Sequence, residues 1–252
     1  MKLREELEST FDGKVLKLES SQLQRIYDYH KHDSALLFLR KGVGLLYPAD
    51  DPDNPDNIFD FFNEARDPIV KELDDSNFEH LTQASTGSTT GDWLIQFYDS
   101  QCVDCNRLSA TWETVGAKLK RRMNVARVNR GTKGILTAKR FKVEQAPEFI
   151  FLRGGKYYRY NLKKYDDESF VGFATSWYSR VAAEKVAPLA SPFENLVDLV
   201  VDKLKSMNLS SQFLTANLPI LAIIGIFFVL LIFLKLKKSS PETEVKVDKK
   251  EE

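Results

Sequence analysis

The chain has 252 residues, of which 43% are apolar and 29% charged, and its formal net charge is zero. This length corresponds to one or two domains, and the apolar content is that of a globular chain rather than a disordered or fibrous one. A balanced charge gives no overall electrostatic reason to bind nucleic acid. Two cysteines are too few for a disulfide-stapled scaffold or a four-thiolate zinc site. The histidines, His30, His32 and His80, lie far from both cysteines, so no metal site is predicted.

The first seventy residues contain a pattern that returns later in the chain. Residues 23–48 and residues 135–160 each run from a helical stretch into a strand with the letters Phe-Leu-Arg, then a glycine turn and a second strand. Residues 57–66 follow the first copy as an apolar helix candidate. The acidic, proline-broken segment 50–57 between them is predicted to be a surface turn. Residues 1–17 contain no apolar stretch of the kind that a secretory signal peptide requires.

From Pro68 to about Ala187, strand-like and helix-like patterns alternate. The last two strands flank the turn Arg153–Gly155 and form a predicted hairpin. Alternation that ends in a hairpin favours an α/β sandwich with a mixed sheet. Strands are predicted at 69–72, 93–98, 125–128, 149–152 and 157–160, and helices at 75–81, 102–120, 135–141 and 168–178.

Both cysteines of the chain stand on the first turn of the predicted helix 102–120, directly after a strand. Two intervening residues at a helix start bring the sulfurs of Cys102 and Cys105 within bonding reach. The first thiol lies where unpaired backbone N–H groups stabilise its thiolate. Cys102 is therefore predicted to exchange with a substrate, and Cys105 to resolve the mixed disulfide. The alternative is an inert structural pair.

These features together resemble the thioredoxin superfamily, and within it the protein disulfide-isomerase branch and the thioredoxin-related transmembrane proteins of the endoplasmic reticulum. The resemblance covers residues 69 to 186. It rests on the strand end Phe97-Tyr98, the Cys102-Val103-Asp104-Cys105 motif, Trp112, and Ala146-Pro147 before the hairpin.

The resemblance implies a thioredoxin fold, in which helices flank a mixed central sheet. It implies that Cys102 and Cys105 form a redox-active disulfide and that no other cofactor is needed. It also implies that Pro147 is a cis-proline whose backbone, with that of Ala146, pairs with an extended substrate peptide. An ordinary proline at the start of a strand is the alternative.

The residues that tune the motif depart from the family pattern. A carboxylate at Asp104, in place of the histidine of the isomerase branch, disfavours the thiolate, so the pair is expected to be a poor oxidant with a reducing potential. An amide at Gln96, in place of a buried proton-relaying acid, is expected to slow turnover. The remaining departures are Gln101 for a tryptophan, Ala110 for a helix proline, and Val143 or Glu144 for an arginine.

By the same resemblance, residues of about 14 to 67 look like the second half of another thioredoxin-like domain. Ser34 stands where the cis-proline would be, and no CxxC precedes it. A half domain lacks its central strands and cannot bury its apolar face alone. Either it packs on its neighbour, or the chain lacks its true beginning. The second interpretation is favoured because it also accounts for the missing signal peptide.

A run of seventeen apolar residues, Leu218 to Leu234, predicts a membrane-spanning helix over residues 216–236. An amphipathic juxtamembrane helix is predicted within 188–215. Three lysines follow the span directly, so the positive-inside rule places the tail 237–252 in the cytosol and the large domain across the membrane. Near the end of the tail, Lys249 and Lys250 resemble a dilysine retrieval signal of endoplasmic reticulum membrane proteins. Asn208, in an Asn-Leu-Ser sequence, is a candidate glycan acceptor.

Five segments are thus predicted: a partial thioredoxin-like domain (1–67), a thioredoxin domain (68–187), a juxtamembrane helix (188–215), a transmembrane helix (216–236) and a cytosolic tail (237–252). The predicted function is that of a single-pass endoplasmic reticulum thiol–disulfide oxidoreductase with a lumenal thioredoxin domain. Its partners would be unfolded or oxidised secretory proteins, bound as mixed disulfides. The alternatives are a redox-weak client-binding module and a tail-anchored cytosolic reductase, the latter suggested by the absent signal peptide.

Overall fold

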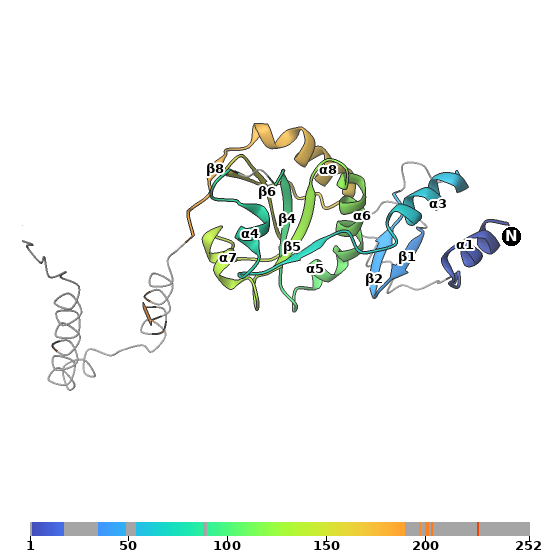
Figure 1. Cartoon of the computed structure of the whole chain (residues 1–252), viewed down its shortest axis with the longest axis horizontal. Helices are drawn as coiled ribbons and strands as arrows, with labels where there is room; N and C mark the ends of the chain where they lie inside the picture. The colour runs from blue at the N-terminus through green and yellow to red at the C-terminus, as the bar shows by residue number, and fades with distance from the viewer. Residues whose placement is uncertain are drawn as a thin grey trace, which may run out of the picture. The chain divides into compact units, whose positions relative to one another are not determined.

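The computed structural model describes residues 2–17, 35–48, 54–87 and 90–189, together with five single residues nearer the C-terminus. The chain divides into two units, Met1–Leu189 and Ala190–Glu252. Figure 1 labels the helices and strands of the first unit. No helix among the described residues is long and apolar enough to cross a membrane. The predicted span 216–236 lies outside the described residues, apart from Ile226. The predicted domain boundary after residue 67 falls inside the first unit.

A six-stranded mixed sheet forms the centre of the first unit, with the strand order β3-β5-β4-β6-β7-β8. β3, β5 and β4 run parallel, whereas β6 is antiparallel to β4 and β7 is antiparallel to β6. The carboxyl ends of β4 and β5 therefore share one edge of the sheet with the start of β6. This mixed sheet confirms the predicted α/β architecture. The strands are β3 (Lys71–Leu73), β4 (Trp93–Tyr98), β5 (Asn124–Asn129), β6 (Glu148–Arg153), β7 (Lys156–Arg159) and β8 (Glu184–Lys185).

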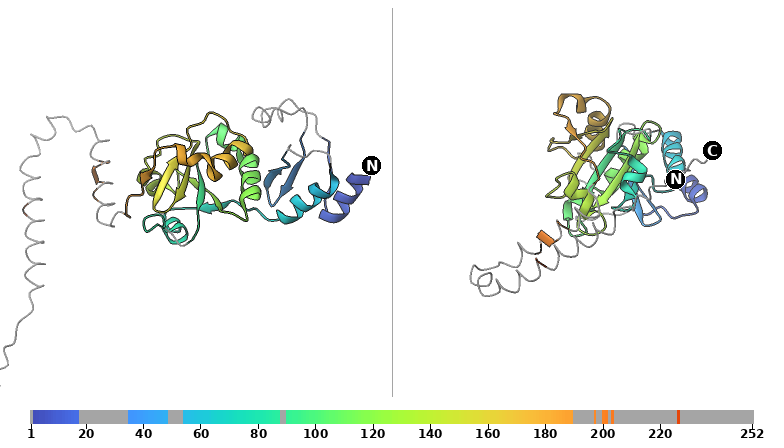
Figure 2. Two further views of the ribbon diagram at one scale, coloured as in Figure 1. Left: turned by 90° about the horizontal axis from the view of Figure 1, so that it is seen from above. Right: turned by 60° about the vertical axis from the view of Figure 1, so that its left-hand side comes forward.

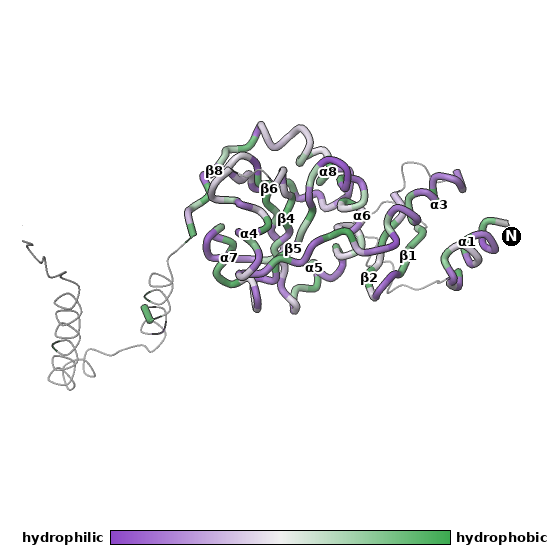
Figure 3. The backbone as a smooth tube through the Cα atoms, in the orientation of Figure 1, coloured by the Kyte–Doolittle hydropathy of each residue, from purple (hydrophilic) through white to green (hydrophobic). Residues whose placement is uncertain are grey.

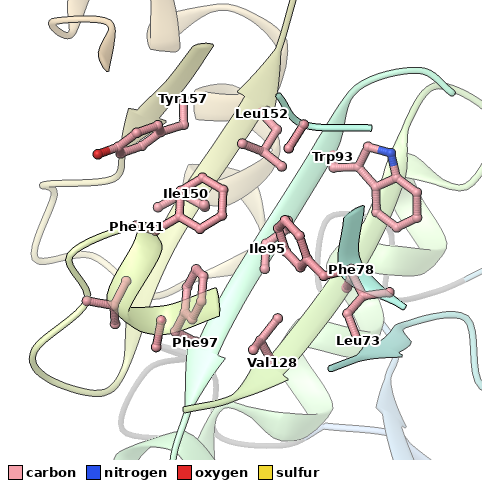
Figure 4. Close-up of a cluster of buried hydrophobic side chains, with 14 of the residues drawn as sticks. Leu73, Phe78, Trp93, Ile95, Phe97, Val128, Phe141, Ile150, Leu152 and Tyr157 are labelled. Carbon is pink, nitrogen blue, oxygen red and sulfur yellow. The ribbon is translucent and has the colours of Figure 1, made fainter. Parts of the chain in front are cut away.

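Helices cover both faces of this sheet. Side chains along a strand alternate between the two faces, and each face presents apolar side chains that must be buried. Ile95 of β4 packs in a core with Phe78 and Phe141 (Figure 4). Leu94 points to the other face, where Trp112 and Phe170 complete a second core. The hydrophobic segments accordingly gather along the central strands (Figure 3). The helices are α4 (Phe78–Thr82), α5 (Val103–Arg107), α6 (Ser109–Leu119), α7 (Ile135–Arg140), α8 (Asp167–Thr175) and the 3-10 helix η1 (Trp177–Arg180).

Three predicted helices of the thioredoxin-like region differ from the structure by more than one residue at an end. The predicted helix 102–120 is interrupted at Leu108, whose flattened backbone (ψ −8°) separates α5 from α6. The predicted helix 75–81 begins only at Phe78, because the Asp74 carboxylate holds the preceding residues in a turn by accepting backbone N–H groups from Ser76 and Asn77. The predicted helix 168–178 ends at Thr175 and continues as η1.

The N-terminal segment builds a smaller core of its own. The hairpin turns at Lys41 and Gly42, which both have positive φ, as a two-residue hairpin loop requires. One face of the hairpin packs against the helices through Leu45, Phe62 and Leu7. The hairpin and the closing helix are present as predicted, but the helix begins at Pro55, so the end of the predicted surface turn 50–57 is helical. Ser34 and the predicted helical stretch before it lie outside the described residues, and the first helix was not predicted. The elements are α1 (Lys2–Phe11), β1 (Leu37–Arg40), β2 (Val43–Leu46) and α3 (Pro55–Glu64).

The hairpin also packs on α6, through its strand β2 (Figure 2). Arg40 forms an ion pair with Glu113 at 2.7 Å, and both side chains are only 4% exposed. The Thr114 hydroxyl donates a hydrogen bond to the Leu46 carbonyl at 2.7 Å. At Ala110, the position of the family's helix proline, the Cβ lies 3.5 Å from where a side chain at Gly44 would begin. The segment thus packs on its neighbour, whereas the alternative that the chain lacks its true beginning stays a prediction.

Candidate active site

The two cysteines form a disulfide at the sheet edge where β4 ends. Cys102 caps α5, and its sulfur accepts a hydrogen bond from the backbone N–H of Cys105 at 3.0 Å. The S–S distance is 2.10 Å and the two Cα atoms are 5.2 Å apart. Cys105 is 4% exposed, whereas Cys102 is half-buried. An incoming thiolate therefore has access to the outer sulfur, while the inner sulfur is shielded.

The Ala146–Pro147 peptide bond is cis, as the resemblance implies. It directly precedes β6, whose first residue, Glu148, pairs with Phe97 near the end of β4. The cis bond therefore lies at the same edge of the sheet as the disulfide. Glu148 forms an ion pair with Arg159 of β7, which anchors the start of β6 to its neighbour. Substrate binding by Ala146 and Pro147 stays a prediction.

Gln96 lies within β4, six residues before Cys102, and is 2% exposed. It points to the same sheet face as Leu94, the face that α6 and α8 cover. Its side-chain Nε2 has no hydrogen-bond partner in the part of the chain that the structure describes. An amide has no carboxylate that could take up a proton at this depth. Slow turnover remains the expectation from this residue.

The acid inside the motif does not stand alone. The Asp104 carboxylate accepts a hydrogen bond from the Arg107 guanidinium at 3.1 Å, one turn later on the same short helix. The positive charge offsets part of the effect that the carboxylate has on a nearby thiolate. The shift toward reducing potentials is therefore expected to be smaller than an unpaired acid would give.

The other predicted site residues are at the surface or outside the described residues. Gln101 is exposed, and its backbone N–H donates to the Asp99 carboxylate at 3.1 Å. Glu144 is exposed before the cis-proline, while Val143 is 5% exposed. The last three lie outside the described residues: Asn208, Lys249 and Lys250.

Polar residues to which the sequence analysis gave no role in the site lie around the loop before Cys102. Asn129, at the end of β5, is 9% exposed and donates from its side-chain amide to the Ser100 hydroxyl at 2.9 Å. Tyr98 donates to the Glu72 carboxylate at 2.6 Å. Burial, and then this bond, raise the pKa of Tyr98 and keep its hydroxyl neutral. The sequence signal that could have indicated this cluster is the asparagine directly after the predicted strand 125–128.

The site has a disulfide at a strand-to-helix turn, an accessible outer sulfur, a buried inner one and a neighbouring cis-proline. Within the described residues, no group of three or more His, Cys, Asp or Glu side chains is arranged to hold a metal ion. The mixed sheet and its flanking helices define a thioredoxin-like α/β fold. The thioredoxin family model matches residues 69–176, which contain β3 through α8 and both cysteines.

Two relatives are similar to parts of the chain. A thioredoxin domain-containing protein of Theileria parva is 35% identical over 129 residues, which cover 51% of this chain and 58% of the relative. An uncharacterized protein of Schizosaccharomyces pombe is 29% identical over 68 residues, which cover 27% of this chain and 9% of that protein. The chain thus matches little more than half the length of the first relative.

Among solved structures, the first thioredoxin domain of mouse protein disulfide-isomerase A4 is 19% identical, with a TM-score of 0.40, over 50% of this chain and 88% of that domain. Full-length ERdj5 is 20% identical, with a TM-score of 0.40, over 74% of this chain and 26% of that protein. Human ERp44 in its zinc-bound form is 16% identical, with a TM-score of 0.37, over 43% of this chain and 32% of that protein.

Proposed function

We propose that the protein is a thiol–disulfide oxidoreductase of the protein disulfide-isomerase type that acts on protein disulfides. The observation that carries this proposal is the disulfide itself, in which Cys102 is half-buried and Cys105 is 4% exposed. Attack on a disulfide needs access along the sulfur–sulfur bond from outside. The burial of Cys105 leaves Cys102 as the sulfur that a protein substrate meets.

The reaction proceeds through two exchanges. A substrate thiolate attacks the sulfur of Cys102, the Cys102–Cys105 bond breaks, and Cys105 leaves as a thiolate that takes up a proton. A second substrate thiolate then attacks the substrate sulfur of the mixed disulfide and releases Cys102. The substrate loses two electrons and the pair gains them. In the opposite direction, Cys102 attacks a substrate disulfide and Cys105 releases the substrate in its reduced form.

The proposed setting is the endoplasmic reticulum, with the thioredoxin-like domain in the lumen and secretory proteins as substrates. Its support is the apolar run Leu218–Leu234, the lysines that follow it, and the pair Lys249 and Lys250. In sealed microsomes, the domain should resist added protease and Asn208 should carry a glycan that glycosidase removes. Digestion of the domain without detergent would place it in the cytosol instead.

Trapping tests the proposed chemistry. In the full chain in detergent, Cys105→Ser should accumulate a mixed disulfide between Cys102 and a secretory substrate that contains a disulfide, because Cys102 opens that disulfide and the resolving thiol is missing. Cys102→Ser is the matched control and should trap none. Equilibration of the native chain in glutathione buffers, with alkylation of free thiols, should show a reversible pair. A pair that never opens or never closes across those buffers would overturn the proposal.

A second candidate, a client-binding module with a weak redox pair, is favoured by the buried amide of Gln96. Its Nε2 has no partner among the described residues and offers no proton acceptor. Such a module should bind unfolded clients equally well before and after Cys102→Ser, and the native chain should not turn over disulfides. Replacing Gln96 with Glu should then raise turnover if the missing acid is what limits the redox reaction.

A further inference from the structure

The end of β5 supports the loop that precedes Cys102. The side chain of Asn129 makes two hydrogen bonds there: its Nδ2 donates to the Ser100 hydroxyl at 2.9 Å, and its Oδ1 accepts the backbone N–H of Gly131 at 3.0 Å. The residue is 9% exposed, so water competes little for these bonds. One amide thus ties the loop after β4 to the turn after β5.

The turn after β5 also fixes Asp99, the first residue of the same loop. A Cβ atom at Gly131 would lie 2.7 Å from the Asp99 Oδ2. The Asp99 carboxylate can therefore occupy this position only because residue 131 has no side chain. The other oxygen of Asp99 accepts the N–H of Gln101 at 3.1 Å, and its backbone carbonyl accepts the N–H of Cys102 at 3.1 Å. Arg130 adds a backbone hydrogen bond to the carbonyl of Tyr98 at 2.9 Å.

These contacts connect the end of β5 to the backbone of Cys102 through residues 98–101, and none of them involves a cysteine sulfur. In the oxidised protein, the covalent bond itself keeps Cys102 and Cys105 together. In the reduced protein, the position of Cys102 depends on the loop and on the contacts that hold it. Holding two reacting groups in place raises their effective concentration. A well-held loop therefore favours closure of the disulfide.

We propose that Asn129 and Gly131 are positioning residues that hold Cys102 close to Cys105 in the reduced protein and so stabilise the disulfide against glutathione. This inference rests on the proposed oxidoreductase function, because it concerns the equilibrium of the same pair. According to this inference, residues at the end of β5, outside the CxxC motif, help to set the reduction potential of the cysteine pair.

The test is the redox equilibrium of the full chain in glutathione buffers. Asn129→Ala should lower the equilibrium constant for disulfide formation about tenfold, the order of effect of one or two lost hydrogen bonds. This corresponds to a reduction potential about 30 mV less negative. The matched control is Asn124→Ala at the opposite end of β5. Asn124 also accepts one hydrogen bond, from Lys71, and donates one, to the Thr90 carbonyl. Its replacement should leave the potential unchanged.

Two exposed positions keep the test informative if Asn129→Ala does not fold. Ser100→Ala removes one of the two bonds, and Gly131→Ala displaces the Asp99 carboxylate. Both should shift the potential in the same direction by a few-fold in equilibrium constant. Because Ser100 and Asn129 share one bond, the double variant should shift it no further than Asn129→Ala alone.

Equal potentials for the native chain, Asn129→Ala and Gly131→Ala, with lowered melting temperatures only, would overturn the inference and leave the proposed function intact. A shift of the same size in Asn124→Ala would also overturn it, because the effect would not be specific to the cysteine loop. If the native pair is not reversible in these buffers, the proposed function itself fails. The two failures are therefore distinguishable.

Discussion

The N-terminal segment and the thioredoxin-like region bury the apolar side chains of their sheets in different ways. The six-stranded sheet carries helices and a core on each face. The hairpin of β1 and β2 shares a smaller core with α1 and α3. Its strand β2 also packs on α6, a helix that covers one face of the larger sheet. The difference teaches that a half-sized element becomes stable by sharing a helix with a complete neighbour.

The helix α6 is buried on two sides, by the large sheet and by the N-terminal segment. Trp112 and Val115 pack in the core of the large sheet, whereas Glu113 and Thr114 face the hairpin and the segment before β3. All four are at most 3% exposed. A helix buried on two sides loses the simple amphipathic pattern of a surface helix. Its polar residues at these positions therefore mark a second interface.

The largest expected effect comes from a substitution in the core of the six-stranded sheet. Trp112 is 1% exposed, and its indole N–H donates to the Ala126 carbonyl at 3.0 Å. Trp112→Ala should lower the free energy of unfolding by about 5 kcal/mol, since it opens a cavity and removes the hydrogen bond to the Ala126 carbonyl. Phe62→Ala in the small core should cost about 3 kcal/mol. It should leave the redox equilibrium of the cysteines unchanged. Urea denaturation with an alkylation readout checks both, and a redox shift in Phe62→Ala would contradict the division.

The second-largest effect is expected from the buried ion pair between the N-terminal segment and α6. Arg40→Ala leaves the Glu113 carboxylate buried, with the backbone N–H of Ile69 as a remaining donor. The expected loss is about 3 kcal/mol, because an unpaired buried charge is costly. Lys41→Ala is the control one residue away. Its ion pair with Asp67 is exposed on both sides, so no measurable change is expected. Similar urea midpoints for the two variants would show that the buried pair does not join the regions.

A smaller effect tests the same interface without a charge. Thr114→Val keeps the shape of the side chain but removes the hydroxyl that donates to the Leu46 carbonyl. We expect a loss of about 1–2 kcal/mol, the cost of a buried carbonyl without its partner. Protection of the β2 amides against hydrogen exchange should fall more than that of β4. Equal loss of protection in both strands would indicate that the regions unfold as one.

The smallest effect concerns pH within the thioredoxin-like region. Burial raises the pKa of the Glu79 carboxyl, but hydrogen bonds from Ser85 and Arg140 outweigh burial and hold it below its ordinary value of 4.5. The resulting stability is fully present above pH 4.5 and is lost as the pH falls through the lower folded-state pKa. Glu79→Gln should therefore flatten the fall in urea midpoint that sets in as the pH drops below about 4.5. An unchanged slope would rule this carboxyl out as a cause of acid sensitivity.

The sequence predicted most where local patterns decide the structure. The strand 93–98 was predicted end to end, because an apolar run between polar segments is typical of a buried strand. The spacing of Cys102 and Cys105 likewise pointed directly to the disulfide. The break at Leu108 was missed because it is a change of backbone angle with no proline or glycine to mark it.

Contacts between distant residues were harder to predict. Arg40 and Glu113 are charged residues that a sequence pattern places at the surface, yet both are buried because they pair across 73 positions. Asn129 and Ser100 are 29 positions apart, and nothing local links a strand-end asparagine to a serine after another strand. The cysteine pair was therefore visible in the sequence, whereas the distant contacts around it were not.

The separation of Arg40 from Glu113 has a consequence for synthesis of the chain. The hairpin leaves the ribosome before the helix that covers it, and 73 positions separate the two partners. At about 5–20 residues per second, the apolar face of β2 waits roughly 4–15 s for α6 to emerge. During that interval the nascent chain presents an uncovered hairpin to the chaperones around it. Slowing of translation between residues 46 and 110 would lengthen this exposure and should raise the misfolded fraction.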